Sequence, residues 1–339
     1  MRPKYYDEWV ERYADSIIKQ YILQIGDKLL KERETIIKKV REQLEDFMKD
    51  ICILQSKADF SIGCIQGALL ATSVINDKPS IIYEAFDQDQ EYGHVYVAKE
   101  YEIDWLFTGW EELKESLQQS ILENGYARLL SFEAVKSFMI EQIPSCAYVF
   151  TYFVKYIFKE MDSFKYFSDL KVGENFYISA GCYHDFYKIL YKKQKNKDIL
   201  ISQNDRDFSF GQFSQYVYRK KKIVTGNFKS AVFSDCRFMD VNILGCDFSD
   251  CEFNNCSFTR VTINDSVFHG SIFRECTFSQ VLFQKCISKK GLIIEKNCIK
   301  DICREAAFIQ SEMKNVDFKE CDMKDCRYIE TKTDEDLEK

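Results

Sequence analysis

The sequence predicts a chain in two parts, a mainly helical α+β domain followed by an all-β solenoid. In the first two hundred residues, hydrophobic side chains recur at helical spacing, with a few strand-like stretches among them. After residue 225, large side chains recur every five positions instead. A period of five fits neither a helical turn nor an ordinary strand, and a fixed internal period is the signature of a solenoid. At 339 residues the chain is long enough for both parts.

Long helices are expected at the beginning of the chain. Residues 4–55 carry apolar side chains at helical spacing with mixed charges between them, which is typical of a helical hairpin or an antiparallel pair. Residues 80–86 and 94–107 alternate aromatic and β-branched side chains with polar ones and are expected to be strands. Residues 176–192 are left open between helix and strand.

Further helices are expected in the middle of this domain. Thr108 is placed to cap the first one, with Glu111 three residues later for the reciprocal bond of a capping box. The next is expected to open at Ser131 and to break before Pro144. The apolar stretch 146–161 then predicts a separate buried helix.

Two small motifs in this domain favour structural over catalytic interpretations. Gly63 and Gly67 predict close packing between helices, with a dimer face as the alternative. Cys182 and His184, beside Asp185, would suit a Cys/His nucleophile, because a neighbouring His lowers the pKa of a thiol. Side chains two positions apart rarely align for proton transfer, so a structural role is the stronger interpretation.

The cysteines are concentrated in the last third of the chain, where ten of the fourteen follow residue 230. Most of them share a five-residue period with large side chains that stand two positions later. The large residues in this phase are Phe228, Phe233, Phe238, Ile243, Phe248, Phe253, Phe258, Ile263, Phe268, Phe273, Phe278, Phe283, Phe308 and Phe318. The small residues before them include Ala231, Cys236, Cys246, Cys251, Cys256, Cys276, Cys286, Cys321 and Cys326.

The stretch AVFSDCRFMDVNILGCDFSDCEFNNCSFTRV resembles the pentapeptide-repeat family, whose unit is a small residue, Asp or Asn, Leu or Phe, and two variable residues. The resemblance covers residues 226–330. It implies a right-handed quadrilateral β-helix with about 20 residues per coil, in which one large residue points inward from each side and the small residue packs at the corner. The variable residues would then point outward, as expected for Asp235, Arg237, Asp240, Asn255 and Arg260.

The repeat is interrupted at residues 287–305, where Lys296 and Asp301 stand in place of small residues. This segment is either a loop or short helix that leaves the solenoid, which we favour, or a degraded coil. Upstream, the basic run 219–222 and the missing small residues indicate a cap at best. The expected division is therefore a mainly α-helical domain with a few strands (1–198), a linker or cap (199–225), the repeats (226–330) and an acidic tail (331–339).

Composition and motifs argue against several kinds of chemistry. The nucleotide-binding patterns GxxxxGK[ST] and GxGxxG are absent, as are HExxH, GxSxG and CxxC, and only 3 His are present. The cysteines of the repeat are expected to be buried packing residues, because parallel side chains on a ladder are poorly aimed for disulfides and zinc prefers closer ligand spacing. We therefore expect no catalytic, cofactor-binding or metal-binding residues and no cofactor.

A cytoplasmic location is expected, because no signal peptide or apolar run long enough for a membrane span is visible. With a net charge of −7, a broad phosphate-binding surface and direct nucleic-acid binding are not expected. The resemblance implies a non-catalytic protein, and we favour a scaffold that binds a protein partner of unknown identity; a homodimer is left open.

Two alternatives remain. Some members of the family protect DNA gyrase by imitating duplex DNA, which requires an acidic rod, yet residues 226–330 carry 9 Asp and 7 Glu against 9 Lys and 5 Arg, a net charge of −2. The second alternative is an enzymatic activity in the N-terminal domain, for which no catalytic residues can be named.

Overall fold

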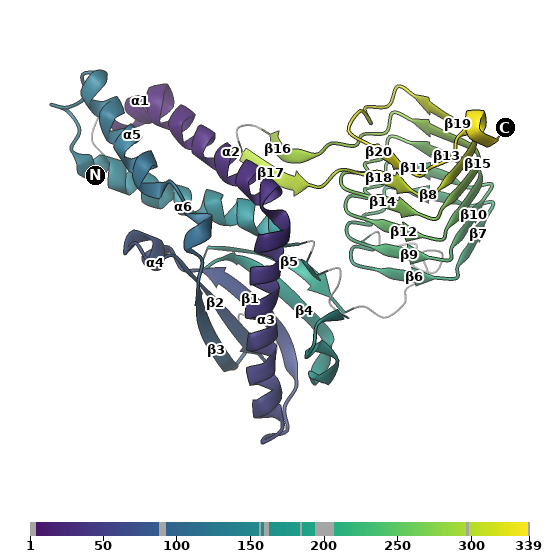
Figure 1. Cartoon of the computed structure of the whole chain (residues 1–339), viewed down its shortest axis with the longest axis horizontal. Helices are drawn as coiled ribbons and strands as arrows, with labels where there is room; N and C mark the ends of the chain where they lie inside the picture. The colour runs from purple at the N-terminus through teal and green to yellow at the C-terminus, as the bar shows by residue number, and fades with distance from the viewer. Residues whose placement is uncertain are drawn as a thin grey trace. The chain divides into compact units, whose positions relative to one another are not determined.

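The computed structural model describes residues 5–87, 93–155, 157–158, 163–183, 185–193, 207–295 and 298–337. The chain divides into two compact units. The N-terminal unit consists of residues 1–192 with 294–301, and the C-terminal unit of residues 193–293 with 302–339. The N-terminal unit combines helices with one sheet, and the C-terminal unit is built from short stacked strands (Figure 1).

Residues 6–55 are helical, which confirms the expectation for the beginning of the chain. Trp9 anchors the helices, because its side chain is fully buried, donates a hydrogen bond from Nε1 to Ser120 Oγ at 3.0 Å and packs edge-on against Phe138. The helices are α1 (Tyr6–Trp9), a π-helical turn (Val10–Ala14), α2 (Asp15–Lys31), α3 (Arg33–Gln55), α4 (Ala71–Ile75), α5 (Trp110–Glu123) and α6 (Phe132–Val154).

A five-stranded sheet completes this unit, in the order β3-β2-β1-β4-β5. All neighbours are antiparallel except β1 and β4, which run parallel. Helix α3 packs against it, with Phe47 on Tyr83 and with Asp46 and Asp50 bound to the Lys99 ammonium at 2.7 and 2.6 Å. The strands are β1 (Ile62–Leu69), β2 (Ser80–Phe86), β3 (Val95–Glu102), β4 (Val172–Cys182) and β5 (Phe186–Lys192).

The capping prediction for Thr108 is wrong. Helix α5 begins at Trp110, and its N-cap is Gly109, which has a φ of +82°. Because this left-handed conformation suits glycine, the helix starts one residue later than expected. The Thr108 hydroxyl instead donates to the Trp105 carbonyl and accepts a hydrogen bond from Lys28 Nζ.

The predicted helix break before Pro144 is also wrong, because α6 runs through this proline. Proline removes one backbone hydrogen bond and strains the preceding turn. The cost is offset by packing, since Cys146, Ala147 and Phe150 are almost completely buried. The separate helix expected from residue 146 is the second half of α6.

Gly67 lies in a strand rather than in a helix, so the expected helix–helix contact is absent there. A Cβ atom at this position would lie 2.8 Å from Tyr83 Cε1 on the neighbouring strand. Close packing is therefore the reason for this glycine, but the contact is made across a sheet. The ambiguous stretch 176–192 belongs to β4 and β5.

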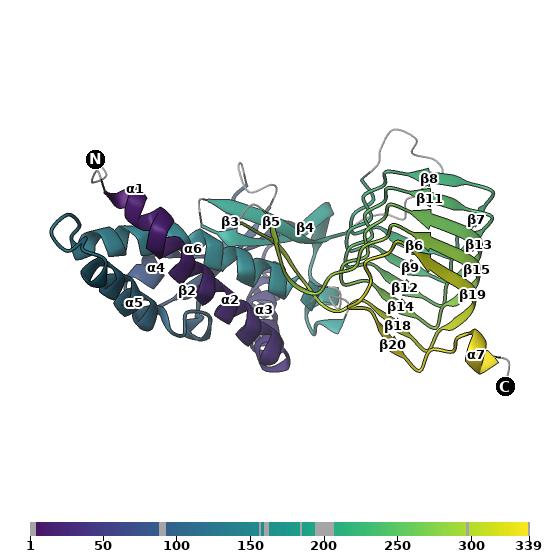
Figure 2. The ribbon, with the colours of Figure 1, turned by 90° about the horizontal axis from the view of Figure 1, so that it is seen from above.

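The C-terminal unit repeats one coil of about 20 residues, and the strand residues of each coil pair with their equivalents in the next (Figure 2). Phe238 pairs with Phe258 and Phe258 with Phe278, in parallel. Each coil has four segments, which we call sides A to D. Side A is held by isolated bridges such as Asn227 with Asp247, side B is the six-stranded sheet, and sides C and D form the seven-stranded sheet.

Most strands of the coils are three residues long, whereas β13, β15 and β19 continue from side C to side D. The strands of side B are β6 (Gln212–Ser214), β9 (Val232–Ser234), β12 (Glu252–Asn254), β14 (Ile272–Arg274), β18 (Ala307–Ile309) and β20 (Arg327–Ile329). Those of sides C and D are β7 (Val217–Arg219), β8 (Lys222–Val224), β10 (Arg237–Met239), β11 (Asn242–Leu244), β13 (Ser257–Asn264), β15 (Thr277–Gln284) and β19 (Glu312–Lys319).

The coil turns because every fifth residue adopts a left-handed conformation, with φ of +55° at Asp235 and Asp240, +63° at Gly245 and +51° at Asn255. Glycine, asparagine and aspartate tolerate this conformation best. Less suited residues such as Thr225 also adopt it, at +53°. The pairing of successive coils outweighs the local strain there.

Residues 207–225 form a coil of the same kind as the later ones, although small residues are missing at two of its positions. Tyr216 and Lys221 stand where Cys236 and Val241 stand one coil later. The small residues of later coils face the preceding coil, and no coil precedes residue 207 in the part of the chain that the structure describes. Large side chains are therefore tolerated here, and the segment is a coil rather than the cap that the missing small residues predict.

The interruption is a β-hairpin inserted between sides A and B. Its strands, β16 (Gly291–Glu295) and β17 (Cys298–Cys303), form their own two-stranded sheet. Phe273 pairs directly with Phe308, so the coil closes across the insertion. Arg304 fixes its base by donating to the Gly270 carbonyl and by a 2.9 Å ion pair with Glu252.

The acidic tail contains a short helix. Residues Asp334–Leu337 form the short helix α7, and the Asp334 carboxylate accepts the Asn315 backbone N–H. No described helix is long and apolar enough to cross a membrane.

Candidate interaction surface

The structure places the large residues of the period in one buried cluster along the centre of the coils. Ile243, Ile263 and the phenylalanines from Phe228 to Phe308 are buried, whereas Phe318 in the last complete coil is only partly so. Of the small residues, Ala231, Cys236, Cys246, Cys251, Cys256, Cys276 and Cys286 are buried, and Cys321 and Cys326 are partly buried. The positions that repeat in the sequence therefore line the interior.

The phenylalanine rings stack in columns that follow the coils. Phe238 lies 4.8 Å from Phe258 with an interplanar angle of 1°, and Phe258 lies 4.9 Å from Phe278 at 4°. Rings of adjacent sides meet edge to face, as Phe253 does with Phe258. Both arrangements add to the energy of burial, so the columns hold the coils in register.

The small residues also make hydrogen bonds that the sequence did not reveal. The Cys251 thiol donates to the Phe228 carbonyl at 2.8 Å, and Cys256 donates to Phe233 at 3.4 Å. In each case the acceptor is the backbone of the large residue in the preceding coil. Serine does the same at Ser311, which donates to Phe273 at 3.3 Å. A small side chain with a donor therefore suits the corner better than alanine or valine.

The coil cysteines are not poised for nucleophilic chemistry. Burial raises the pKa of the Cys246 thiol to about 11 and that of Cys286 to about 12. The neighbouring Cys256 thiol, and then burial, raise the pKa of the Cys236 thiol. No disulfide joins the cysteines that the structure describes, and no group of three or more metal ligands occurs among the described residues.

The Cys182 motif likewise does not form an activated thiol. Cys182 is buried at the end of β4, where burial and then the charge of Asp185 raise its pKa to about 11. A nucleophilic cysteine needs a lowered pKa instead. His184 lies outside the described residues.

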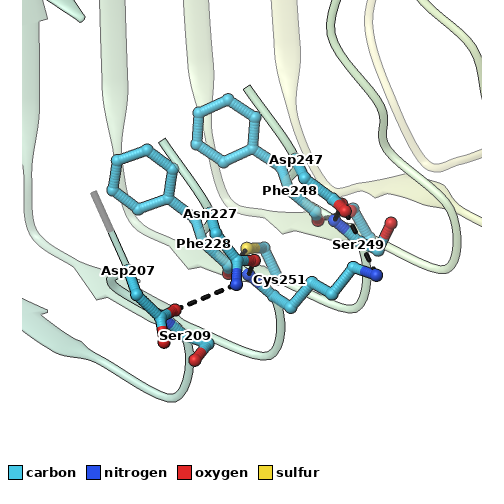
Figure 3. A network of polar contacts seen from close by, with 10 residues as sticks. Asp207, Ser209, Asn227, Phe228, Asp247, Phe248, Ser249 and Cys251 are labelled. Atoms are coloured by element: carbon cyan, nitrogen blue, oxygen red, sulfur yellow. Dashed lines mark hydrogen bonds and ion pairs between the residues drawn. The ribbon is translucent and has the colours of Figure 1, made fainter. Parts of the chain in front are cut away.

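The outer face of side A is organised by Asp and Asn side chains, which follow one another from coil to coil (Figure 3). Asp207 Oδ1 accepts hydrogen bonds from the Ser209 backbone and, at 2.9 Å, from Asn227 Nδ2. Asp247 repeats the backbone bond with Ser249. These Asx turns satisfy backbone groups where side A lacks strands.

Elsewhere the outer surface pairs its charges between neighbouring coils. Arg260 binds Asp240 with two hydrogen bonds, at 2.6 and 3.0 Å, and this contact lowers the pKa of the Asp240 carboxyl. Lys229 pairs with Asp247 at 3.3 Å, and Lys332 with Glu312 at 3.9 Å. Such exposed pairs contribute little stability.

One region departs from this pattern. Arg219, Lys220, Lys221 and Lys222 turn the corner between sides C and D of the first coil. In the second coil Arg237 pairs with Val217, two residues before Arg219. All five side chains are exposed. Within the described residues none of them forms a salt bridge, and the nearby Asp240 is bound by Arg260. We call these five residues the basic strip.

The geometry defines a β-solenoid repeat protein, with a packed interior and a regular outer surface. A family model described as pentapeptide repeats (nine copies) matches residues 228–272. The match confirms the resemblance to pentapeptide repeats that the sequence predicts for this part of the chain. No curated protein matches the chain.

Several solved structures are similar to the repeat part. Rfr23, a pentapeptide repeat protein from the cyanobacterium Cyanothece 51142, is 7% identical over 41% of this chain and 94% of its own, with a TM-score of 0.25. QnrB1, a plasmid-mediated fluoroquinolone resistance protein, is 12% identical over 34% of this chain and 71% of its own, with a TM-score of 0.15. HetL from Nostoc sp. strain PCC 7120, a pentapeptide repeat protein involved in regulating heterocyst differentiation, is 9% identical over 40% and 95%, with a TM-score of 0.14. TM-scores of this size carry no argument about function.

Proposed function

We propose that this chain is a non-catalytic, cytoplasmic scaffold that binds a protein partner through the outer surface of its coils. The observation that carries the proposal is that the cysteines of the repeat, its most reactive residues, have structural roles. They pack in the interior and donate hydrogen bonds to the backbone, and burial raises the pKa of their thiols. What varies from coil to coil is the set of outward side chains, held at fixed spacing on paired strands.

We further propose that the coils form the right-handed quadrilateral β-helix implied by the family resemblance. Four paired segments per coil and left-handed residues at every fifth position support this architecture. Such a solenoid is stiff, because each coil is fixed to its neighbours by backbone pairing and by stacked rings. Stiffness favours binding, since little conformational entropy is lost when a partner docks.

The charge distribution does not favour the DNA-mimic alternative. A mimic of duplex DNA needs a continuous acidic face. On sides C and D the first two coils instead carry the five cations of the basic strip, and other acidic residues such as Asp240 and Asp247 are paired with cations. We expect no protection of DNA gyrase from a fluoroquinolone at micromolar protein in a supercoiling assay; protection would revive this alternative.

The scaffold proposal is tested by affinity capture of the tagged full chain from its native host, with quantitative mass spectrometry. We expect specific enrichment of a partner protein over the tag alone, and loss of that partner when several outward residues of the coils are changed together. A chain that captures no partner and shows a measurable turnover with the coils intact would contradict it.

A further inference from the structure

We propose that the basic strip docks a short acidic segment of a protein, one that interleaves Asp or Glu with apolar side chains. The inference deepens the proposed scaffold function and rests on it. Its basis is the concentration of like charge at this corner, beside exposed apolar side chains.

The first argument is the local excess of positive charge, since Asp240 is the one acidic group whose pKa these cations are seen to lower among the described residues and it is already bound by Arg260. Four cations are consecutive at Arg219–Lys222, and strand pairing sets Arg237 beside Val217, one coil away. Four consecutive like charges, with a fifth on the adjacent strand, repel one another. A ligand with several carboxylates would relieve this repulsion and could accept forked hydrogen bonds from the two arginines.

The second argument is the apolar surface among the charges. Val217 is 55% exposed and Val224 is 37% exposed, on the same two strands that carry the cations. In the next coil, Met239 pairs with Arg219 and Leu244 pairs with Val224, and both are partly exposed. Met and Arg are enriched at protein–protein interfaces. The strip therefore matches a ligand with alternating acidic and apolar side chains.

The same features favour a protein segment over a nucleic acid. Exposed valine, methionine and leucine give no hydrogen bonds to phosphates, and single-stranded nucleic acids are usually held by exposed aromatic rings. Tyr216, the aromatic residue beside the strip, packs on Tyr218 and Phe213 inside the coil. The net charge of −7 also repels a long polyanion more than a short peptide.

The test begins with a phage-displayed library of random dodecapeptides panned against the full chain. We expect enrichment of peptides that interleave Asp or Glu with apolar residues. The double variant Arg219→Glu/Lys222→Glu should weaken binding of the best peptide at least tenfold, and raising NaCl from 50 to 500 mM should weaken binding to the unchanged protein, because salt screens exposed charges.

The matched control is Lys285→Glu/Lys314→Glu, which makes the same change of charge at exposed lysines of later coils. It should change the affinity less than twofold. Equal loss in both variants, or enrichment of peptides without acidic residues, would overturn the proposal. Tighter strip-dependent binding of a fluorescent duplex or single-stranded oligonucleotide than of the best peptide would also overturn it, in favour of a nucleic acid.

Affinity capture separates this inference from the scaffold function. If the strip variant still captures the partner that the unchanged chain captures, the scaffold function stands and the strip inference fails. If the unchanged chain captures no partner while acidic peptides bind the strip, the docking chemistry stands and the scaffold function fails.

Discussion

At the scale of single residues, the corner cysteines combine small volume with a hydrogen-bond donor. Cys251 is fully buried, and its thiol lies 2.8 Å from the Phe228 carbonyl of the preceding coil. We expect Cys251→Ser to retain most of the stability. Cys251→Ala should lose about 1 kcal/mol with the thiol hydrogen bond, because the Phe228 carbonyl keeps its bond from the Ala231 N–H. Cys251→Leu should cost about 1–3 kcal/mol or more through overpacking. Urea unfolding measures all three; a leucine variant as stable as the unchanged protein would contradict this role.

The same thiols make the fold sensitive to alkaline pH. Burial raises the pKa of Cys246 to about 11 and of Cys286 to about 12, from an ordinary value of 9.0. Because the unfolded chain releases these protons first, the stabilisation is complete below pH 9 and is lost as pH rises toward the folded values. Each thiol contributes a slope of about 1.4 kcal/mol per pH unit in that window. Urea unfolding between pH 8 and 11 should show this decline, and Cys246→Ser/Cys286→Ser should make it shallower.

Backbone conformation also acts at this scale. Gly245 has a φ of +63°, and a Cβ there would meet the Thr225 methyl at 3.5 Å. Gly245→Val should destabilise the coil by about 1–2 kcal/mol, because a β-branched residue is strained in the left-handed region. Thermal unfolding provides the measurement, with Gly125→Val as the comparison at a left-handed glycine outside the coils.

At the scale of elements, the ring columns and the closing of the coil across the hairpin are the main features. Phe253 stacks between Phe233 and Phe273 at 4.8 and 4.7 Å. Phe253→Ala should cost about 3–5 kcal/mol. Tyr328 is half-exposed and stacks on the Phe308 ring at the end of the column. Tyr328→Ala should therefore cost much less than Phe253→Ala. Equal losses in the two variants would argue against the columns as the source of stability.

The hairpin should be dispensable for the coil itself. Removing residues 291–305 joins Lys290 to Ala306 and restores the five-residue spacing, while Phe273 already pairs with Phe308. We expect the shortened chain to keep the β-sheet circular dichroism of the coils, with a modest fall in melting temperature from the lost Arg304–Glu252 ion pair. Loss of the sheet signal would show that the insertion is needed for the fold.

At the scale of the whole molecule, the two units differ in how far their sequences predict them. In the repeat, burial depends on a local period, so the interior could be listed from Phe and Cys positions alone. For residues 207–225 the sequence predicts only a linker or cap, because Tyr216 and Lys221 stand where the repeat has small residues. The structure shows a coil there, and no described coil precedes it. In the N-terminal unit, tertiary contacts determine the local structure, so the sequence pattern alone predicts it less well. Gly67 is needed because the Tyr83 ring lies against it, and core packing stabilises α6 despite Pro144. The sequence shows four cations of the basic strip as the run RKKK. Only the strand pairing shows that Met239 and Leu244 of the next coil lie beside it.

The central claim is that the cysteines and phenylalanines of the repeat serve architecture and leave function to the outer surface. Titration of the native protein with a thiol reagent at neutral pH, followed by titration in denaturant, tests it most directly. We predict that few of the 14 cysteines react before unfolding and that all react after it. Rapid reaction of most of them in the folded protein would contradict the account.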